Sequence, residues 1–161
     1  MKKRLLYFLI LFIFFLIFAL ESEAISIDVS GSWGLTISAN DLISGPCSGL
    51  QSDYESSTNA VTIDVSYASY NRTWRVSVRK IDQSWPNDFI LFTRRTSYSY
   101  GVTGGTNYQE ITNSNRTFIS SNRDRINVSG LAVQFQLSGV SINIPPGTYI
   151  TTIYYTIVEY Y

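Results

Sequence analysis

The side chains that most often perform acid–base or nucleophilic chemistry are scarce in this chain. Its 161 residues include no histidine and a single cysteine, Cys47. Without histidine, neither a Ser-His-Asp nor a Cys-His arrangement can form. The lack of histidine and of further thiols also removes the usual ligands of zinc, copper and haem. No D-x-D-x-D-G loop indicates a calcium site. We therefore expect no metal and no other cofactor.

Carboxylates are the remaining candidates for catalysis. A hydrolase of the paired-carboxylate kind needs two such groups facing each other across a cleft. The candidates each fall at a strand end or in a loop, where a solvated carboxylate is the default: Asp53, Glu55, Asp82, Asp88 and Glu110. We expect no catalytic residue and no enzyme activity, and we keep a small hydrolase as the weaker alternative.

Aromatic side chains could instead form a binding surface. Trp85 lies in a turn-like stretch, and Tyr98 and Tyr100 follow it at short distance in the sequence. Such rings stack on sugars or on a partner chain when they are exposed. The other interpretation is that Trp85 folds back and caps one end of the core. Trp74 alternates with polar residues in a strand-like segment, so we expect it in the core.

The first 24 residues have the layout of a secretory signal peptide. Lys2, Lys3 and Arg4 precede an apolar run from Leu5 to Leu20, and small residues, Ser22 and Ala24, stand where a signal peptidase reads. The run is somewhat short for a membrane span, which needs roughly 20 residues. We expect residues 1–24 to be the signal peptide and residues 25–161 to be one domain that is secreted, periplasmic or on the cell surface. Retention of the leader as an anchor stays open.

Charge and thiol content limit the partners of residues 25–161. The leader carries three of the twelve Lys and Arg and two of the twelve Asp and Glu, which leaves nine cations and ten anions. A nearly neutral domain has no general attraction for nucleic acid or, after leader cleavage, for an anionic membrane. The lone Cys47 cannot form an intrachain disulfide. We expect it to be a half-buried loop residue, rather than a lipid attachment site or an intermolecular bridge.

Alternating apolar and polar residues dominate the remainder of the sequence. Period-two patterns place one set of side chains on each face of a sheet. They predict strands at 25–29, 33–38, 61–65, 74–79, 89–95, 108–111, 131–137, 140–144 and 148–160. Long loops are expected near 40–58 and 112–127, with at most one helical turn between Asn40 and Leu50. About eight short strands with polar turns predict a single all-β, antiparallel sandwich, and a barrel is the alternative.

The terminal strand is long and rich in β-branched and aromatic residues. The prolines at 145 and 146 force a bend before it begins, because proline cannot donate to a strand ladder. Tyr149, Ile153, Tyr155 and Ile157 share one face, and Ile150, Thr152, Tyr154, Thr156 and Val158 share the other. Since both faces are fairly apolar, we expect this strand to be central in a sheet or covered by another part of the molecule.

These segments together resemble secreted fimbrial-type subunits of the spore coat protein U and pilin-like kind. The resemblance is carried by the early Trp33-Gly34-Leu35, by the pair of segments 73–78 and 91–96, and by the Pro-Pro-Gly-Thr-Tyr turn at 145–149 that introduces the last strand. It implies an immunoglobulin-like sandwich with a structural or adhesive role at the cell surface.

A strand-exchange arm would give such a subunit its contacts. An open sheet edge invites a strand from another chain. Ile25, Ile27 and Val29 alternate with polar residues at the start of the mature chain, so this arm could add to a neighbouring subunit near the terminal strand. Pairing within its own domain is the other interpretation. We expect a non-enzymatic structural or adhesive subunit that binds copies of itself or related subunits, and an extracellular carbohydrate-binding module with a glycan ligand is the alternative.

Overall fold

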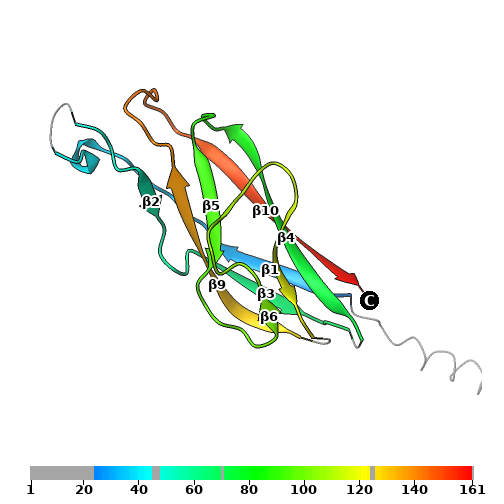
Figure 1. The fold of residues 1–161 in the computed structure, drawn as a ribbon. Coiled ribbons are helices and arrows are strands. Elements are labelled where there is room, and N and C mark those ends of the chain that lie inside the picture. The colour runs from blue at the N-terminus through cyan, green and yellow to red at the C-terminus, as the bar shows by residue number, and fades with distance from the viewer. Residues whose placement is uncertain (1–23, 45–47, 70, 124–125, 161) are drawn as a thin grey trace, which may run out of the picture.

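The computed structural model describes residues 24–44, 48–69, 71–123 and 126–160 (Figure 1). The predicted leader, apart from Ala24, and Cys47 lie outside this part of the chain. Within it there are ten strands, a single turn of 3-10 helix and no α-helix. The strands are β1 (Ser26–Gly31), β2 (Asp53–Glu55), β3 (Val61–Ser66), β4 (Thr73–Ser84), β5 (Ile90–Arg95), β6 (Val102–Thr103), β7 (Gln109–Glu110), β8 (Arg116–Ser121), β9 (Val128–Ser138) and β10 (Ile150–Tyr160), and the 3-10 turn η1 spans Ala39–Asp41. No helix in the described residues has the length and apolar character needed to cross a membrane.

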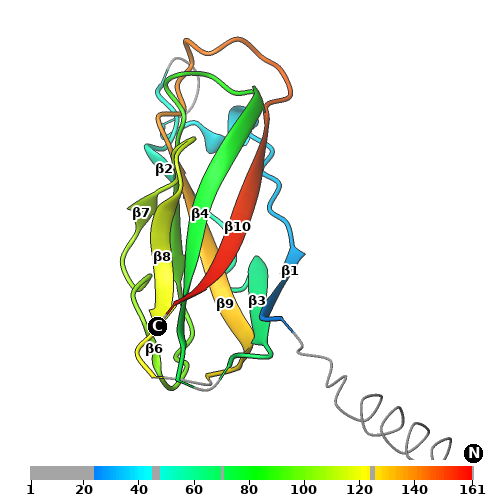
Figure 2. The same ribbon diagram turned by 90° about the vertical axis from the view of Figure 1, so that its right-hand side faces the viewer.

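The strands form two antiparallel sheets, so the predicted all-β antiparallel class is confirmed. One sheet has the order β1-β3-β9-β5-β7, with β2 also paired to β9, and the other has the order β10-β4-β8-β6. In Figure 2 the strands β8, β4 and β10 lie in front of β9 and β3. Strands that are consecutive in the chain therefore often lie in different sheets, which gives most of the pairings a long sequence separation.

A single apolar core lies between the two sheets. Trp74, Val76 and Val78 of β4 and Val61, Ile63 and Val65 of β3 are all buried, while the residues between them are more exposed. This alternation is the pattern that the sequence predicted for both strands. The indole N–H of Trp74 donates to the carbonyl of Ile126 at 2.7 Å, so the largest buried side chain keeps its one polar atom satisfied.

Two predicted strands are wrong. Residues 33–38 pair with no strand, because the chain turns out of the sheet at Gly31 (φ 111°), and Trp33 stacks on Phe135 (ring centroids 6.3 Å apart, planes 9° from parallel). Residues 140–144 form a turn, closed by a backbone hydrogen bond from Ile144 to Ser141. The turn follows Gly139, whose φ of 82° ends β9; a Cβ at this position would lie 1.8 Å from the carbonyl oxygen of Asp88.

Two strands appear inside the predicted loops. β2 lies within 40–58, and β8 lies within 112–127. The alternation of apolar and polar residues did not predict β8. Its register with β4 shifts between Val76 and Ser77, and the adjacent residues Phe118 and Ile119 are both buried. A bulge of this kind interrupts the period-two alternation on which the prediction depends. The short helical turn is η1, which begins at Ala39, just before the predicted region.

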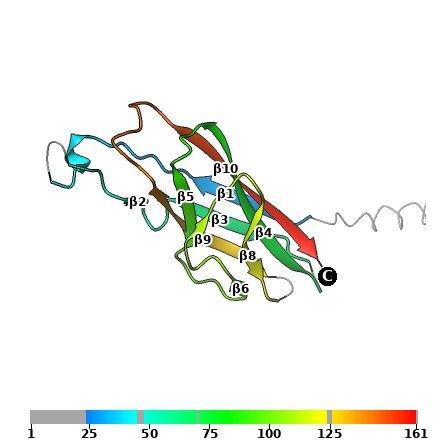
Figure 3. The same ribbon diagram turned by 45° about the horizontal axis from the view of Figure 1, so that its top comes forward.

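The terminal strand is not central. β10 lies at the border of its sheet and pairs only with β4, over eleven residues (Figure 3). The predicted division of its faces holds, since Ile153, Tyr155 and Ile157 pack against the core. The outward rings are partly covered by arginines of β4. The guanidinium of Arg79 lies 5.0 Å from the centroid of Tyr154, and that of Arg75 lies 5.9 Å from the centroid of Tyr160.

Candidate functional site

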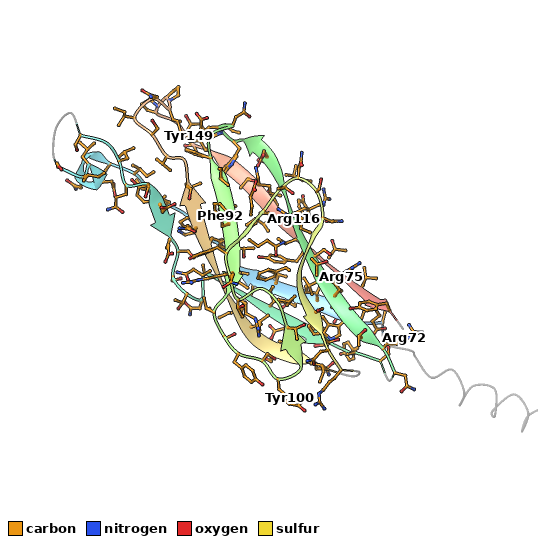
Figure 4. The ribbon with its side chains drawn as sticks, in the orientation of Figure 1. Arg72, Arg75, Phe92, Tyr100, Arg116 and Tyr149 are labelled. Atoms are coloured by element: carbon orange, nitrogen blue, oxygen red, sulfur yellow. The ribbon has the colours of Figure 1, made fainter. Side chains whose placement is uncertain are left out.

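The structure does not bring Trp85, Tyr98 and Tyr100 together. Trp85 is half-buried, donates from its indole N–H to the carbonyl of Phe89 at 3.1 Å and packs edge-on against the Phe89 ring at 5.3 Å. Phe89 in turn contacts Tyr149. Figure 4 shows Tyr149 and Tyr100 at opposite ends of the molecule. Trp85 therefore caps one end of the core, as the second interpretation of the sequence held.

The two exposed tyrosines could still contact a ligand on their own. Tyr98 is 83% exposed and Tyr100 is 61% exposed, the highest values among the exposed aromatic side chains of the described residues. The guanidinium of Arg123 lies 5.2 Å from the ring centroid of Tyr100 and covers part of it. Without Trp85 beside them, the expected three-ring platform for a glycan is not formed.

An apolar groove opens at the Trp85 end of the molecule. It has a volume of about 1130 Å³ and lies between the unpaired segment 32–38, the loop 140–149 and the first half of β10. Its lining contains no Asp, Glu, Lys, Arg or His. The aromatic members of the lining are Trp33, Trp85, Phe89, Phe135, Tyr149 and Tyr155. Such a lining favours burial of apolar side chains and offers no acid–base pair for catalysis.

The groove exists because the chain leaves its sheet after β1. Gly31 has φ 111°, and a Cβ there would lie 2.3 Å from the carbonyl oxygen of Ala60, so only glycine fits this turn. Residues 32–38 then cross the end of the sheet without strand pairing until Ser38 caps η1, where its amide donates to Asp41 Oδ2 at 2.7 Å. The segment covers Phe135 with Trp33 but leaves the space beside β10 open.

The free edge of β10 carries unpaired backbone groups along this side. Two amides of β4 point away from β10: Trp74 donates to Ser121 Oγ at 2.8 Å, and Lys80 donates to the carbonyl of Thr112 at 2.8 Å. Their register partners on β10 are Glu159 and Ile153. In an antiparallel pair, residues alternate between bonding to each other and pointing outward. The backbone N–H and C=O groups of Ile153, Tyr155, Ile157 and Glu159 therefore point to the open edge.

The β10 edge lacks the features that usually protect an edge strand. Natural edges are shielded by lysine, proline, inward-pointing charges or short length. From Ile150 to Val158 the strand has no charged residue and no proline. Glu159 is the one charge, and it is occupied, because its carboxylate accepts from the amide and hydroxyl of Ser69 and lies 3.6 Å from Arg72. A bulge at Ile150/Thr151 is the only irregularity.

The predicted arm residues lie on the same side of the molecule. Ile25, Ile27 and Val29 belong to or adjoin β1, which pairs in register with β3 of its own sheet. Ile25 and Ile27 are only partly buried, and Val29 is 38% exposed. β1 is an edge strand too, and the views in Figures 1 and 2 place it beside β10 across the seam between the sheets. The arm is thus paired in the single chain, where Ile25 and Ile27 pack, partly buried, against the core.

The carboxylate candidates do not assemble a catalytic pair at the groove. Asp53 and Glu55 are exposed on β2, and two serine hydroxyls, of Ser138 and Ser52, hold the pKa of Asp53 below its usual value. A smaller hollow of about 300 Å³ contains Asp82 and Glu110. Asp82 is neutralised there by Lys80 at 2.5 Å and accepts from Thr151 Oγ1 at 2.8 Å. Among the described residues no group of three potential metal ligands occurs.

Two buried hydroxyls face the interior near the groove. The hydroxyls of Tyr155 on β10, a partly buried residue, and of the buried Thr93 on β5 are both inaccessible, and neither makes a hydrogen bond within the described part of the chain. Burial raises the pKa of Tyr155 far above its ordinary value, and Thr93 is close enough to offset a small part of this shift. Tyr155 therefore stays neutral at any physiological pH.

Comparison with known proteins gives no relative for this chain. No family model, no curated protein and no solved structure matches it.

Proposed function

We propose that this protein is a secreted, non-enzymatic structural subunit that associates with other copies of itself by strand addition at the β10 edge. In this proposal the first 24 residues are a cleaved signal peptide, and the two sheets are an immunoglobulin-like sandwich of the fimbrial kind. The observation that carries the proposal is the unprotected eleven-residue edge of β10 beside an apolar groove. A strand added there satisfies the free backbone groups and buries its apolar side chains at the same time.

The donor we propose is the 25–29 segment of a neighbouring copy. Its alternating Ile25, Ile27 and Val29 would enter the groove, since side chains of one parity share one face of a strand. Releasing the segment from its own sheet breaks its pairing with β3 but removes no fully buried side chain, because Ile25 and Ile27 are partly buried and Val29 is 38% exposed. The β1–β3 pairing is also weakened by Asp28 and Asp64, which lie directly opposite each other in the register; like charges in such positions are destabilising.

The edge is tested by two substitutions at one position. Ile157→Pro removes an amide that points to the open edge and leaves the bonds to β4 in place, whereas Ile157→Ala removes the same side chain and keeps the amide. We expect sedimentation velocity to show concentration-dependent association of the wild type and of Ile157→Ala, and a monomer for Ile157→Pro. Thermal unfolding followed by circular dichroism verifies that both variants fold. Association of a folded Ile157→Pro variant to the wild-type extent would contradict the proposal.

The donor is tested by deleting residues 25–30. We expect the shortened protein to keep its β-rich circular dichroism spectrum and its cooperative unfolding, and to lose self-association. It should also bind a synthetic peptide of residues 24–31 at the open edge of β10. If the deletion abolishes folding instead, β1 is an integral strand of its own domain and the donor assignment is wrong. The Ile157 pair then still decides whether the β10 edge is the acceptor.

A further inference from the structure

The outward face beside β10 carries a charge, that of Arg79, which no described residue neutralises. Arg79 of β4 points away from the core, at the opposite parity to Val76 and Val78, and its guanidinium lies 5.0 Å from the ring centroid of Tyr154 on β10. The ion pairs within the described residues are Arg72–Glu159 and Lys80–Asp82. Arg79 therefore has no carboxylate within ion-pair distance there. Its side chain reaches across the sheet toward the open edge rather than toward a partner inside it.

Asp28, in the proposed donor segment, is a carboxylate without a cationic partner among the described residues. Asp28 lies between Ile27 and Val29, and in its own sheet it is exposed and faces Asp64 across the β1–β3 pair. Asp64 is partly satisfied, because its Oδ1 accepts from the amide of Gly130 at 2.7 Å. Asp28 accepts no hydrogen bond within the described part of the chain and pairs with no cation there. The electrostatic energy of the Asp28 carboxylate therefore becomes more favourable when Asp28 moves away from Asp64.

The parity of the donor places these two charges on the same face. If Ile25, Ile27 and Val29 point into the groove, Asp28 points outward, as Tyr154 and Arg79 do. The donor lies next to β10 at the sheet spacing of about 4.8 Å. Because Arg79 already extends over the Tyr154 ring of β10, its guanidinium is directed to the strand position that the donor would occupy.

We propose that Asp28 of the donor copy forms an ion pair with Arg79 of the acceptor copy, and that this contact fixes the register of the added strand. The inference rests on the proposed function, since it requires strand addition at β10. Arg79 is selected over Arg75 because Tyr154 adjoins Ile153 and Tyr155, which line the groove, whereas Arg75 lies over Tyr160, which is not beside a lining residue. Exchange then moves Asp28 from a carboxylate neighbour to a guanidinium, which favours the assembled state.

A charge-reversal experiment with cross-complementation tests this pair. Arg79→Glu should weaken self-association at ~20 mM salt by at least tenfold, and Asp28→Lys should do the same although it removes the repulsion within β1–β3. Mixing the two variants should restore association, because each supplies the charge that the other lacks. The difference between the variants and the wild type should shrink at ~500 mM salt, where exposed charges are screened over a few ångströms.

Arg75→Glu is the matched control, because it makes the same charge change on the same face and strand, also beneath a tyrosine. We expect it to associate as the wild type does. Wild-type association by Arg79→Glu, equal loss in Arg75→Glu, or no recovery in the mixture would overturn the Asp28–Arg79 pair. If Ile157→Pro still abolishes association in that case, strand addition stands and only the register contact fails. If Ile157→Pro also associates normally, the proposed function fails as well.

Discussion

The two ends of the molecule use the same kind of side chain in opposite ways. At one end Trp74 is fully buried between the sheets, with its indole N–H bonded to Ile126 and its neighbours Val76 and Val78 equally inaccessible. At the other end Trp33 and Trp85 stand at the walls of an open groove. The first end is closed by strand pairing, and the second is left open because residues 32–38 cross it without a partner. If the protein associates at the β10 edge as proposed, its stability and its association should depend on different tryptophans.

Truncation of the tryptophans gives the largest expected effect. Trp74→Ala should destabilise the fold by about 3–5 kcal/mol, because it leaves a cavity in a close-packed core and removes a buried hydrogen bond. Trp85→Ala should cost much less stability, since the ring is partly exposed, and should reduce self-association by removing a wall of the groove. Chemical denaturation and sedimentation measure the two quantities. If Trp85→Ala lowers the free energy of unfolding as much as Trp74→Ala does, the expectation that Trp85 contributes little to stability is wrong.

Alkaline titration sharpens the comparison through a smaller effect. The pKa of Tyr155 is raised chiefly by burial, and the pKa of Tyr108 is raised to about 12 by burial and by Glu55. Both tyrosines therefore ionise more readily in the unfolded chain, where the pKa is about 10. Their contribution to stability is complete below pH 10 and is lost as the pH rises from there through the folded-state values.

The variant Tyr155→Phe should lose less folding stability than the wild type as the pH rises above 10. At neutral pH it should be neutral or stabilising by up to about 1 kcal/mol, because the hydroxyl it removes is buried without a hydrogen bond. Denaturant titrations between pH 7 and 11 measure both effects. A loss of more than about 1 kcal/mol at pH 7 would mean that the hydroxyl has a partner in solution.

The sequence predicted the elements of this fold better than their arrangement. Alternation located β3, β4, β5, β9 and β10, because each strand has one face in the core and one outside. It could not reveal that β10 is an edge strand, since strand order depends on pairings between distant residues. It also misjudged 33–38, where Trp33 and Ile37 alternate with exposed residues but Gly31 has already turned the chain out of the sheet.

The candidate site was predicted only in part. The sequence left open whether the 25–29 arm adds to the terminal strand of another copy or pairs within its own domain. In the single chain it pairs with β3 and lies beside β10. The structure does not form the ring platform of Trp85, Tyr98 and Tyr100, because the strand β5 lies between Trp85 and the two tyrosines in the chain and carries them away from it. The groove had no sequence signal, because it is formed by an absence of pairing.

Amide hydrogen exchange of β10 tests the central claim most directly. In dilute monomer, the amides of Ile153, Tyr155 and Ile157 should exchange rapidly, while those of Tyr154 and Thr156 are protected by β4. In concentrated, associated protein, the first group should gain protection of at least tenfold and the second should change little. Equal exchange of the Ile153, Tyr155 and Ile157 amides in the two states would contradict strand addition at this edge.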